Sequence, residues 1–350
     1  MVKEITIGNR KVGSGHPCFI IAEGGVNHNG NLKLAYQLVD IASQAGADAV
    51  KFQTFKAEKI VTQDAPKATY QLQTTLPIES QYEMLRRLEL STEAHHTLQA
   101  YCQEKNIIFM STPFDEESAD FLEKLGVEVF KIPSGEITNL PFLAHVARKG
   151  KPMIISTGMA CLGEVEKACH TVAQAGNQQC ILLHCVSNYP ANPADANLRA
   201  MQTMALAFQF LVGFSDHTMG IEVALAAVAL GACVLEKHFT LDRNLPGPDH
   251  RASLEPVELG SLVRGSRKVE AALGHGRKEA APSEANTQAA ARRSIVADHD
   301  IPAGTVLTEE LITFKRPGTG LPPAMLPYLI GRTARVLIPK GTLIKLETLA

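Results

Sequence analysis

Residues 211–238 read LVGFSDHTMGIEVALAAVALGACVLEKH and contain the unit that recurs through most of the chain. A short apolar run, Leu211–Phe214, is followed by a helical pattern over Glu222–Leu230 and by a second apolar run, Cys233–Leu235. Gly231 fits a helix end, because glycine readily adopts the left-handed conformation that closes many helices. This order predicts two parallel strands joined by a helical crossover.

Strand-like runs of this kind occur eight times. The other six are Cys18–Ala22, Ala49–Phe52, Ile107–Met110, Glu128–Ile132, Pro152–Ile155 and Ile181–Cys185. Helical spacing between runs is clearest at Leu32–Ala45, Ser91–Lys105 and Glu116–Leu125. Eight strands that alternate with helices predict an α/β fold, a (β/α)₈ TIM barrel. The alternative is a doubly wound sheet, but its usual G-x-G-x-x-G turn is not matched by residues 23–30, EGGVNHNG.

The amino-acid composition changes after the expected barrel domain of residues 1–275. Residues 276–292 are polar with glycine and proline, which indicates a linker. Residues 293–350 then form a small domain, in which Ile-Pro-Ala-Gly-Thr at 301–305 returns as Ile-Pro-Lys-Gly-Thr at 338–342. The repeat predicts two similar turn-and-strand units, and so small a domain is expected to dock on another surface.

The charge balance excludes some partners. The 350 residues carry 34 Lys and Arg against 36 Asp and Glu, a formal charge of −2, so we expect neither a nucleic acid nor a membrane partner. There is no apolar run of the roughly 20 residues that a membrane span needs, and we expect a cytoplasmic protein. Seven cysteines without a C-x-x-C pair indicate neither a disulfide framework nor a zinc ribbon.

Polar side chains gather at the end of every predicted strand, where a TIM barrel places its catalytic groups. The long connection over residues 56–90 is expected to be an elaborated loop with short helices near the same face. The strand-end motifs are Glu23, Lys51-Phe-Gln53, Ser111-Thr112, Lys131 to Glu136, Ser156-Thr-Gly-Met159, His184 to Tyr189, Ser215-Asp-His217 and Glu236-Lys-His238.

Two lysines at this mouth suggest an anion site. Lys51 and Lys131 supply point charge, and the hydroxyls of Ser134, Ser156 and Ser215 supply donors without bulk. A compact, highly charged anion such as a phosphorylated carboxylic acid suits this set. The alternative is that each lysine pairs with a strand-end glutamate in a structural network.

Two histidines, His217 and His238, end neighbouring strands. They are within reach of one cation and leave coordination positions for water and substrate, which indicates an exchangeable divalent metal. The alternative is that each is a hydrogen-bonded core or rim residue, as single histidines commonly are. His184 has no such spacing argument and is assigned a supporting position.

Three carboxylates complete the candidate set. Glu23 and Glu136 are candidate acid–base or orienting groups, and the alternative is that a glutamate at a strand end caps the next helix. Asp249 lies in the turn Pro-Gly-Pro-Asp-His at 246–250, where it could present its carboxylate to sugar hydroxyls or serve ordinary turn chemistry.

Taken in order, these motifs resemble the sialic acid (nonulosonate) synthase family. The match rests on EGGVNHNG at 23–30, KFQT at 51–54, STPF at 111–114, KIPSGE at 131–136, STGM at 156–159, SDHT at 215–218 and EKHFT at 236–240. KRPGTG at 315–320 resembles the antifreeze-like (SAF) domain that ends such synthases. The resemblance covers essentially the whole chain.

The resemblance implies a transferase that condenses phosphoenolpyruvate with an open-chain 2-acetamido-mannose-type sugar and water, releasing phosphate. It implies Mn²⁺ or Mg²⁺ on His217 and His238, and a domain-swapped homodimer in which Arg316 reaches the sugar's acetamido group across subunits. Glu136 manages the attacking water in this scheme. The implied phosphoenolpyruvate ligands are Lys51, Thr112, Lys131, Ser134, Ser156 and Ser215, the sugar ligands are Glu23, Gln53, Tyr189, Asp249 and Arg316, and the catalytic set is Glu23, Lys51, Lys131 and Glu136.

The acceptor sugar is the open point. Residues 80–85, 187–190 and 246–250 look more like legionaminic acid synthases, whose acceptor is 2,4-diacetamido-2,4,6-trideoxymannose, than like N-acetylneuraminate synthases, which use N-acetylmannosamine. One departure is that Ser187 stands where some sialic acid synthases have asparagine, with Asn188 one place later. The alternatives from other classes are a pyruvate-dependent metal aldolase and a non-enzymatic glycan-binding protein. The lysines and serines argue against the first, and eight polar strand ends argue against the second.

Overall fold

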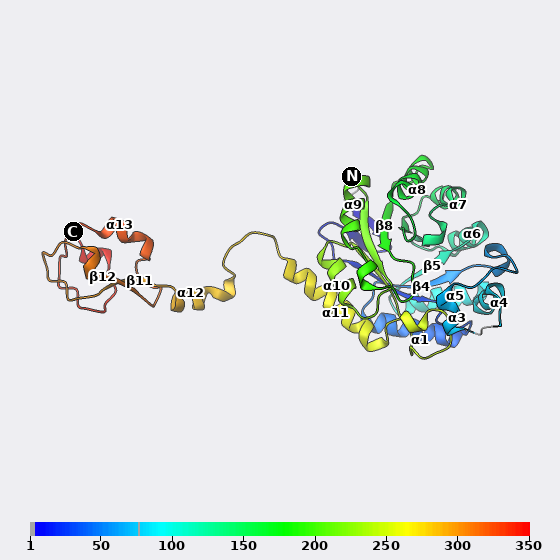
Figure 1. Ribbon diagram of the computed structural model, residues 1–350, viewed down its shortest axis with the longest axis horizontal. Coiled ribbons are helices and arrows are strands. Elements are labelled where there is room, and N and C mark those ends of the chain that lie inside the picture. The colour runs from blue at the N-terminus through cyan, green and yellow to red at the C-terminus, as the bar shows by residue number, and fades with distance from the viewer. Residues whose placement is uncertain (1–3, 76–77) are drawn as a thin grey trace. The chain divides into compact units, whose positions relative to one another are not determined.

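All eight strand-like runs form parallel strands in the computed structural model, which describes residues 4–75 and 78–350 (Figure 1). The hydrogen-bonded order is β5-β4-β3-β10-β9-β8-β7-β6, and the two ends of this order, β5 and β6, lie side by side. The sheet therefore curls into a TIM-type barrel, and the predicted fold class is confirmed. The strands are β3 (Phe19–Gly25), β4 (Ala49–Thr54), β5 (Ile108–Pro113), β6 (Phe130–Ile132), β7 (Met153–Ser156), β8 (Cys180–Cys185), β9 (Leu211–Asp216) and β10 (Val234–His238).

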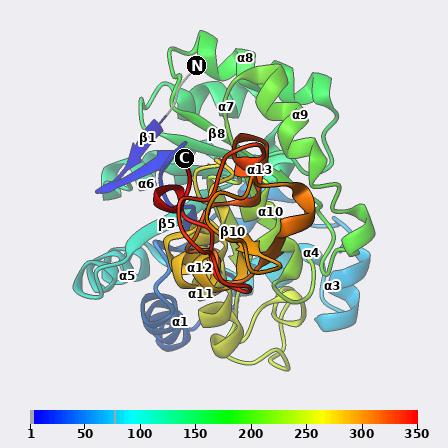
Figure 2. The ribbon, with the colours of Figure 1, turned by 90° about the vertical axis from the view of Figure 1, so that its left-hand side faces the viewer.

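Helices follow the strands and lie outside them, as the views in Figures 1 and 2 show. Asn31 begins the first one by accepting a hydrogen bond from Lys33 N, and Gly46 ends it with a φ of 80°, as its sequence pattern predicts. No helix among residues 4–75 and 78–350 is both long and apolar enough to cross a membrane. The outer helices are α1 (Leu32–Ala45), α5 (Thr92–Glu104), α6 (Glu116–Leu125), α7 (Leu140–Ala147), α8 (Leu162–Gln174), α9 (Arg199–Phe208), α10 (Glu222–Ala229) and α11 (Pro256–Leu273).

An N-terminal hairpin that the sequence analysis did not predict packs into the barrel interior. Its strands are β1 (Glu4–Ile7) and β2 (Arg10–Gly13), which pair antiparallel. Ile5, Ile7 and Val12 are buried in one cluster with inward-facing residues of the barrel strands, such as Ile21 and Ile154. Burial of these side chains fills the interior below the strand ends and so supports the floor of the mouth.

The long connection between β4 and β5 carries three short helices among its described residues. They are α2 (Ala57–Ile60), α3 (Thr69–Thr74) and α4 (Gln81–Leu88). Ser80 and Glu83 form a reciprocal capping box that begins α4. The expectation of an elaborated loop with short helices is confirmed for these residues.

The second unit runs from His275 to Ala350 and has its own buried core. It contains α12 (Ala285–Ala291), which lies within the predicted linker 276–292, and an antiparallel pair, β11 (Ser294–Ala297) and β12 (Ile312–Lys315), followed by α13 (Leu326–Leu329). The two Ile-Pro-x-Gly-Thr repeats meet. Ile301 and Ile338 exchange both backbone hydrogen bonds at 2.9 Å, so an isolated antiparallel bridge joins the two repeats, and neither repeat forms a longer strand.

Candidate functional site

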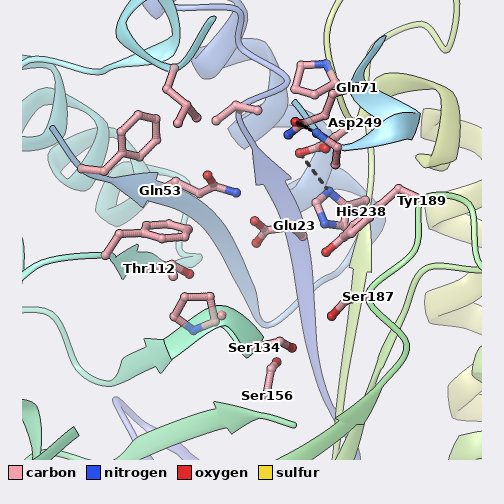
Figure 3. A pocket seen from close by; sticks show the side chains of 18 of the residues that line it. Glu23, Gln53, Gln71, Thr112, Ser134, Ser156, Ser187, Tyr189, His238 and Asp249 are labelled. Atoms are coloured by element: carbon pink, nitrogen blue, oxygen red, sulfur yellow. Dashed lines mark hydrogen bonds and ion pairs between the residues drawn. The ribbon is translucent and has the colours of Figure 1, made fainter. Parts of the chain in front are cut away.

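A cavity of about 490 Å³ opens among the carboxyl ends of the barrel strands, and Figure 3 shows part of its lining. Every site residue that the sequence analysis placed on the barrel lines this cavity. Those residues are Glu23, Lys51, Gln53, Thr112, Lys131, Ser134, Glu136, Ser156, Tyr189, Ser215, His217, His238 and Asp249. The barrel therefore brings together side chains that lie more than 200 positions apart in the sequence.

The floor of the cavity is a buried network of two lysines and two glutamates. Lys51 Nζ lies 2.5 Å from Glu23 Oε2 and 3.7 Å from Glu236 Oε2, and it donates to Thr112 Oγ1 at 2.8 Å. Lys131 Nζ lies 3.2 Å from Glu236 Oε1. Each lysine therefore pairs with a strand-end glutamate, which is the structural alternative given above. Both lysines also line the cavity, so the pairing does not remove them from the site.

The pKa values of the two glutamates in this network are shifted in opposite directions. Burial raises the pKa of Glu23 to about 7, even though Lys51 opposes it. Burial would also raise the pKa of Glu236, but the ammonium groups of Lys131 and Lys51 outweigh it and hold the pKa at about 2. The two lysines therefore favour the ionised form of Glu236, whereas burial favours the protonated form of Glu23.

The pKa values of the two lysines are also shifted in opposite directions. Burial disfavours the charged form of Lys51, but Glu23 and Glu236 outweigh it and raise the pKa. Burial lowers the pKa of Lys131, which has the attraction of Glu236 to offset it but also the repulsion of Lys51. A bound anion would add negative charge to both and stabilise their charged forms.

Hydroxyl groups surround this pair of cations. Ser156 Oγ is buried without a hydrogen-bond partner among the described residues, and Ser215 Oγ donates to Glu236 Oε1 at 3.0 Å. Ser134 Oγ accepts from the backbone N–H of Gly158 at 3.0 Å. A Cβ at Gly158 would lie 2.7 Å from Ser134 Oγ, so only glycine allows this approach. An unpartnered buried hydroxyl in a cavity that also holds two lysines indicates a site built for an anion.

His217 and His238 lie next to this network, with ring centroids 5.5 Å apart, because Ser215 Oγ contacts both Glu236 Oε1 and His217 Nε2. Nδ1–H of His217 donates to the carbonyl of Val186 at 2.7 Å, so Nε2 carries the lone pair, and its contact with Ser215 Oγ is long, at 3.5 Å. Burial lowers the pKa of His217 to about 4 and that of His238 well below its usual value, so both rings are neutral. Nδ1 of His238 is buried without a hydrogen-bond partner among the described residues.

Neutral, under-bonded imidazoles are suitable metal ligands, so these residues fit a divalent cation. No group of three or more His, Cys, Asp or Glu residues is arranged to hold a metal within residues 4–75 and 78–350. Two protein ligands with the remaining positions open is the arrangement that the sequence predicts. The ring of Tyr189 lies 4.2 Å from His217 and 5.6 Å from His238, centroid to centroid, and orients the pair.

The carboxylates of Asp249 and Glu136 both reach the cavity. The side chain of Asp249 does not cap the short helix that follows it. Its Oδ2 lies 4.0 Å from Nδ1 of His238. Burial raises the pKa of Asp249 to about 6. Its carboxylate therefore faces the site rather than serving the turn alone (Figure 3). Glu136 is half-buried and accepts from Asn139 Nδ2 at 2.7 Å. Glu23 pairs with Lys51 and caps no helix.

Four polar residues that line the cavity were not selected from the sequence as site residues: Glu236, Tyr70, Gln71 and Gln81. Glu236 lies two residues before His238 on the same strand, so both side chains point to the same face. This alternation could have placed Glu236 in the site from the sequence. Tyr70 and Gln71 lie on α3, inside the long connection, where no motif marks them; the Tyr70 ring stacks 5.1 Å from Tyr189.

Three polar residues in β8 and the loop after it, His184, Ser187 and Asn188, differ in whether they reach the cavity. Ser187 lines the cavity, and Asn188 is exposed and is not among the lining residues. His184 Nε2 donates to the carbonyl of Ala196 at 2.8 Å and is also not among the lining residues, in keeping with a supporting position.

A fully buried ion pair lies directly behind the two histidines. Lys237 Nζ is 2.7 Å from Asp216 Oδ2, both side chains have no exposed surface, and Lys237 also donates to the carbonyl of Thr218. Asp216 and Lys237 adjoin His217 and His238 in the chain, so the pair joins the two strand ends that carry the histidines.

We expect Lys237→Met to lower the free energy of unfolding by about 3–5 kcal/mol, because it leaves the Asp216 carboxylate buried and uncompensated. The double variant Asp216→Leu with Lys237→Met removes both charges and is expected to lose much less. Denaturant unfolding of the wild type and the two variants measures this. Equal losses in both would contradict an energetic coupling of the pair.

Arg316 lies in the second unit, at the start of the loop after β12. Its side chain is exposed, and Nε donates to the carbonyl of Ala291 in α12 at 3.0 Å. Gly318 N donates to the carbonyl of Ala289 at 2.7 Å, so the loop is held on α12 at two points. Its predicted reach into a partner subunit stays a prediction.

Comparison with known proteins agrees with this geometry. The model of the NeuB family matches residues 38–278, and that of the SAF domain matches residues 292–350. The N,N'-diacetyllegionaminic acid synthase of Legionella pneumophila is 49% identical over 344 residues, covering 95% of this chain and 97% of that protein. The synthase of the same name from Campylobacter jejuni is 51% identical over 317 residues, covering 90% and 95%. The crystal structure of N-acetylneuraminic acid synthetase from Leptospira borgpetersenii, in complex with citrate, superposes with a TM-score of 0.72 at 39% identity, covering 81% of this chain and 94% of that one.

Proposed function

Because the chain belongs to the NeuB family, we propose that it is a nonulosonate synthase that condenses phosphoenolpyruvate with an open-chain 2-acetamido-mannose-type sugar and water. The single observation that carries this proposal is one cavity that holds two buried lysines beside an unpartnered serine hydroxyl, and two neutral histidines. The two lysines suit a phosphorylated acid, and the two histidines suit a cation that binds an aldehyde.

In this proposal, phosphoenolpyruvate binds over Lys51 and Lys131. Ser134, Ser156 and Ser215 donate to its oxygens. Glu236 keeps the two ammonium groups charged and in place before the anion arrives. Glu23 takes up a proton as the anion binds, because added negative charge raises a pKa that already lies at about 7. The bound state thereby avoids two carboxylates facing a phosphate.

The reaction forms a bond between the methylene carbon of phosphoenolpyruvate and the aldehyde carbon of the sugar. The aldehyde oxygen takes up a proton and becomes a hydroxyl. Water adds to the enol carbon and loses its protons, and the bond between that carbon and the phosphate oxygen breaks, which releases phosphate and leaves a 2-keto acid. We propose that Glu136 orients the water and that Glu23 holds the mobile proton. His217 and His238 would hold Mn²⁺ or Mg²⁺, which supplies Lewis-acid polarisation of the aldehyde oxygen.

For the acceptor we propose 2,4-diacetamido-2,4,6-trideoxymannose, with N-acetylmannosamine as the alternative. The two relatives named N,N'-diacetyllegionaminic acid synthase, each about half identical over at least nine-tenths of the chain, support the first. The test is phosphate release with each sugar. Release with phosphoenolpyruvate but none with pyruvate separates this function from an aldolase, and release with neither sugar would contradict the proposal.

We expect Lys51→Ala and Lys131→Ala to raise the KM for phosphoenolpyruvate much more than the KM for the sugar. A buried charge-assisted hydrogen bond contributes about 1.5–3 kcal/mol, which corresponds to roughly a tenfold to hundredfold rise. Lys105→Ala is the matched control, since Lys105 pairs with Asp40 and does not line the cavity. Initial rates over a grid of both substrates measure the two constants. Equal rises for both would count against direct contact with phosphoenolpyruvate.

A further inference from the structure

The outer part of the cavity has an apolar wall that the reaction steps above do not use. Six residues form it: Phe55, Ile60, Met84, Leu85, Leu88 and Phe114. They belong to one hydrophobic cluster, in which the rings of Phe55 and Phe114 pack edge to face at 5.8 Å. Leu88 and Met84 are buried, whereas Ile60 and Leu85 are half-buried and line the cavity.

The wall and the anion site occupy different depths. Lys51, Ser156 and Ser215 lie on barrel strands, whereas Ile60 lies on α2 and Leu85 on α4, both in the connection beyond the end of β4. Phosphoenolpyruvate at the lysines and the aldehyde end of the sugar at the histidines take up the strand ends. If the aldehyde end of the sugar lies at the histidines and its six-carbon chain extends outward, C6 comes to the level of α2 and α4.

We propose that the apolar wall selects acceptor sugars whose C6 is a methyl group rather than a hydroxymethyl group. This inference rests on the proposed function and names the part of the molecule that distinguishes the two acceptors. A methyl group gains about 0.8 kcal/mol for each buried carbon. A hydroxyl packed against these six side chains loses its water and finds no hydrogen-bond partner among them, which costs about 1–3 kcal/mol.

The expected selectivity has an upper limit. A hydrophobic pocket rejects a ligand that merely adds a hydroxyl by about a hundredfold at most. We therefore expect a ratio of kcat/KM for the 6-deoxy over the 6-hydroxy sugar of about 10 to 100. The polar side chains Gln53 and Asp249 lie elsewhere in the lining and bind the hydroxyl-bearing carbons in this arrangement (Figure 3).

The experiment uses sugars that differ at C6 alone. One pair is 2-acetamido-2,6-dideoxymannose with N-acetylmannosamine, and the other is 2,4-diacetamido-2,4,6-trideoxymannose with its 6-hydroxy counterpart. Phosphate release gives kcat/KM for each sugar with the full-length wild type. Leu85→Gln places an amide on the wall and is expected to lower the 6-deoxy preference at least fivefold with the KM for phosphoenolpyruvate unchanged, whereas Leu85→Met retains the preference.

Leu206→Gln is the matched control, because Leu206 lies on α9, is 81% exposed and does not line the cavity. Ile60→Gln tests the same wall from α2 if Leu85→Gln does not fold. A ratio near 1 in the wild type, or a ratio that neither wall variant changes, would overturn the inference and leave the proposed function standing. No phosphate release with any of the four sugars would instead overturn the proposed function.

Discussion

Replacing either His217 or His238 by alanine is expected to abolish turnover while the barrel stays folded. Each substitution removes one of the two imidazoles proposed to hold the metal, and a Lewis acid contributes several kcal/mol to carbonyl activation. At about 1.4 kcal/mol for each factor of ten, the loss is on the order of a thousandfold or more. Phosphate release measures turnover, and circular dichroism with thermal melting verifies the fold.

Metal binding gives an independent measurement. Titration of Mn²⁺ followed by electron paramagnetic resonance is expected to show binding to the wild type and a large loss of affinity in both variants. His145→Ala is the control, because His145 lies on α7, pairs with Asp120 and is not among the lining residues. Chelation is expected to inactivate the wild type, and Mn²⁺ or Mg²⁺ to restore it. Wild-type activity of either variant after exhaustive chelation would contradict the two-histidine site.

The barrel and most of its site could be predicted because both follow from local patterns. Apolar runs mark the strands, and in a barrel the carboxyl end of each strand points to the same face. A polar residue at a strand end, such as Lys51 or His217, therefore needs no long-range contact to be placed at the mouth. Gly231 could be placed at a helix end from its local sequence, and it takes the left-handed conformation there, with a φ of 95°.

Other features depend on contacts that no local pattern encodes. The hairpin β1–β2 carries too few apolar residues to be distinguished, and only the packing of its buried face on interior residues of the barrel makes Ile5 and Val12 part of the core. The pairing of Lys51 with both Glu23 and Glu236 depends on how strands β3, β4 and β10 lie side by side. Tyr70 reaches the site only because α3 folds back over the mouth, where its ring meets Tyr189.

The second large effect concerns the C-terminal unit. A chain that ends at Gly276 is expected to keep a folded barrel, because the buried clusters of the barrel contain no residue of the second unit. It is also expected to lose activity, because Arg316 is the proposed ligand of the sugar's acetamido group. Thermal melting and phosphate release separate these outcomes. Full activity of the shortened chain would contradict a role for the tail in the reaction.

Which barrel the tail serves can be decided by mixing two inactive proteins. In the proposed domain-swapped dimer, Arg316 of one subunit completes the site of the other. Random assortment of equal amounts of Arg316→Ala and His238→Ala subunits makes half the dimers mixed. Each mixed dimer then has one barrel with intact histidines facing an intact tail, so about a quarter of wild-type activity is expected to return. Native mass spectrometry verifies the exchange of subunits. If exchange occurs and activity stays absent, the tail acts on its own barrel, because a mixed dimer then contains no site with both residues intact.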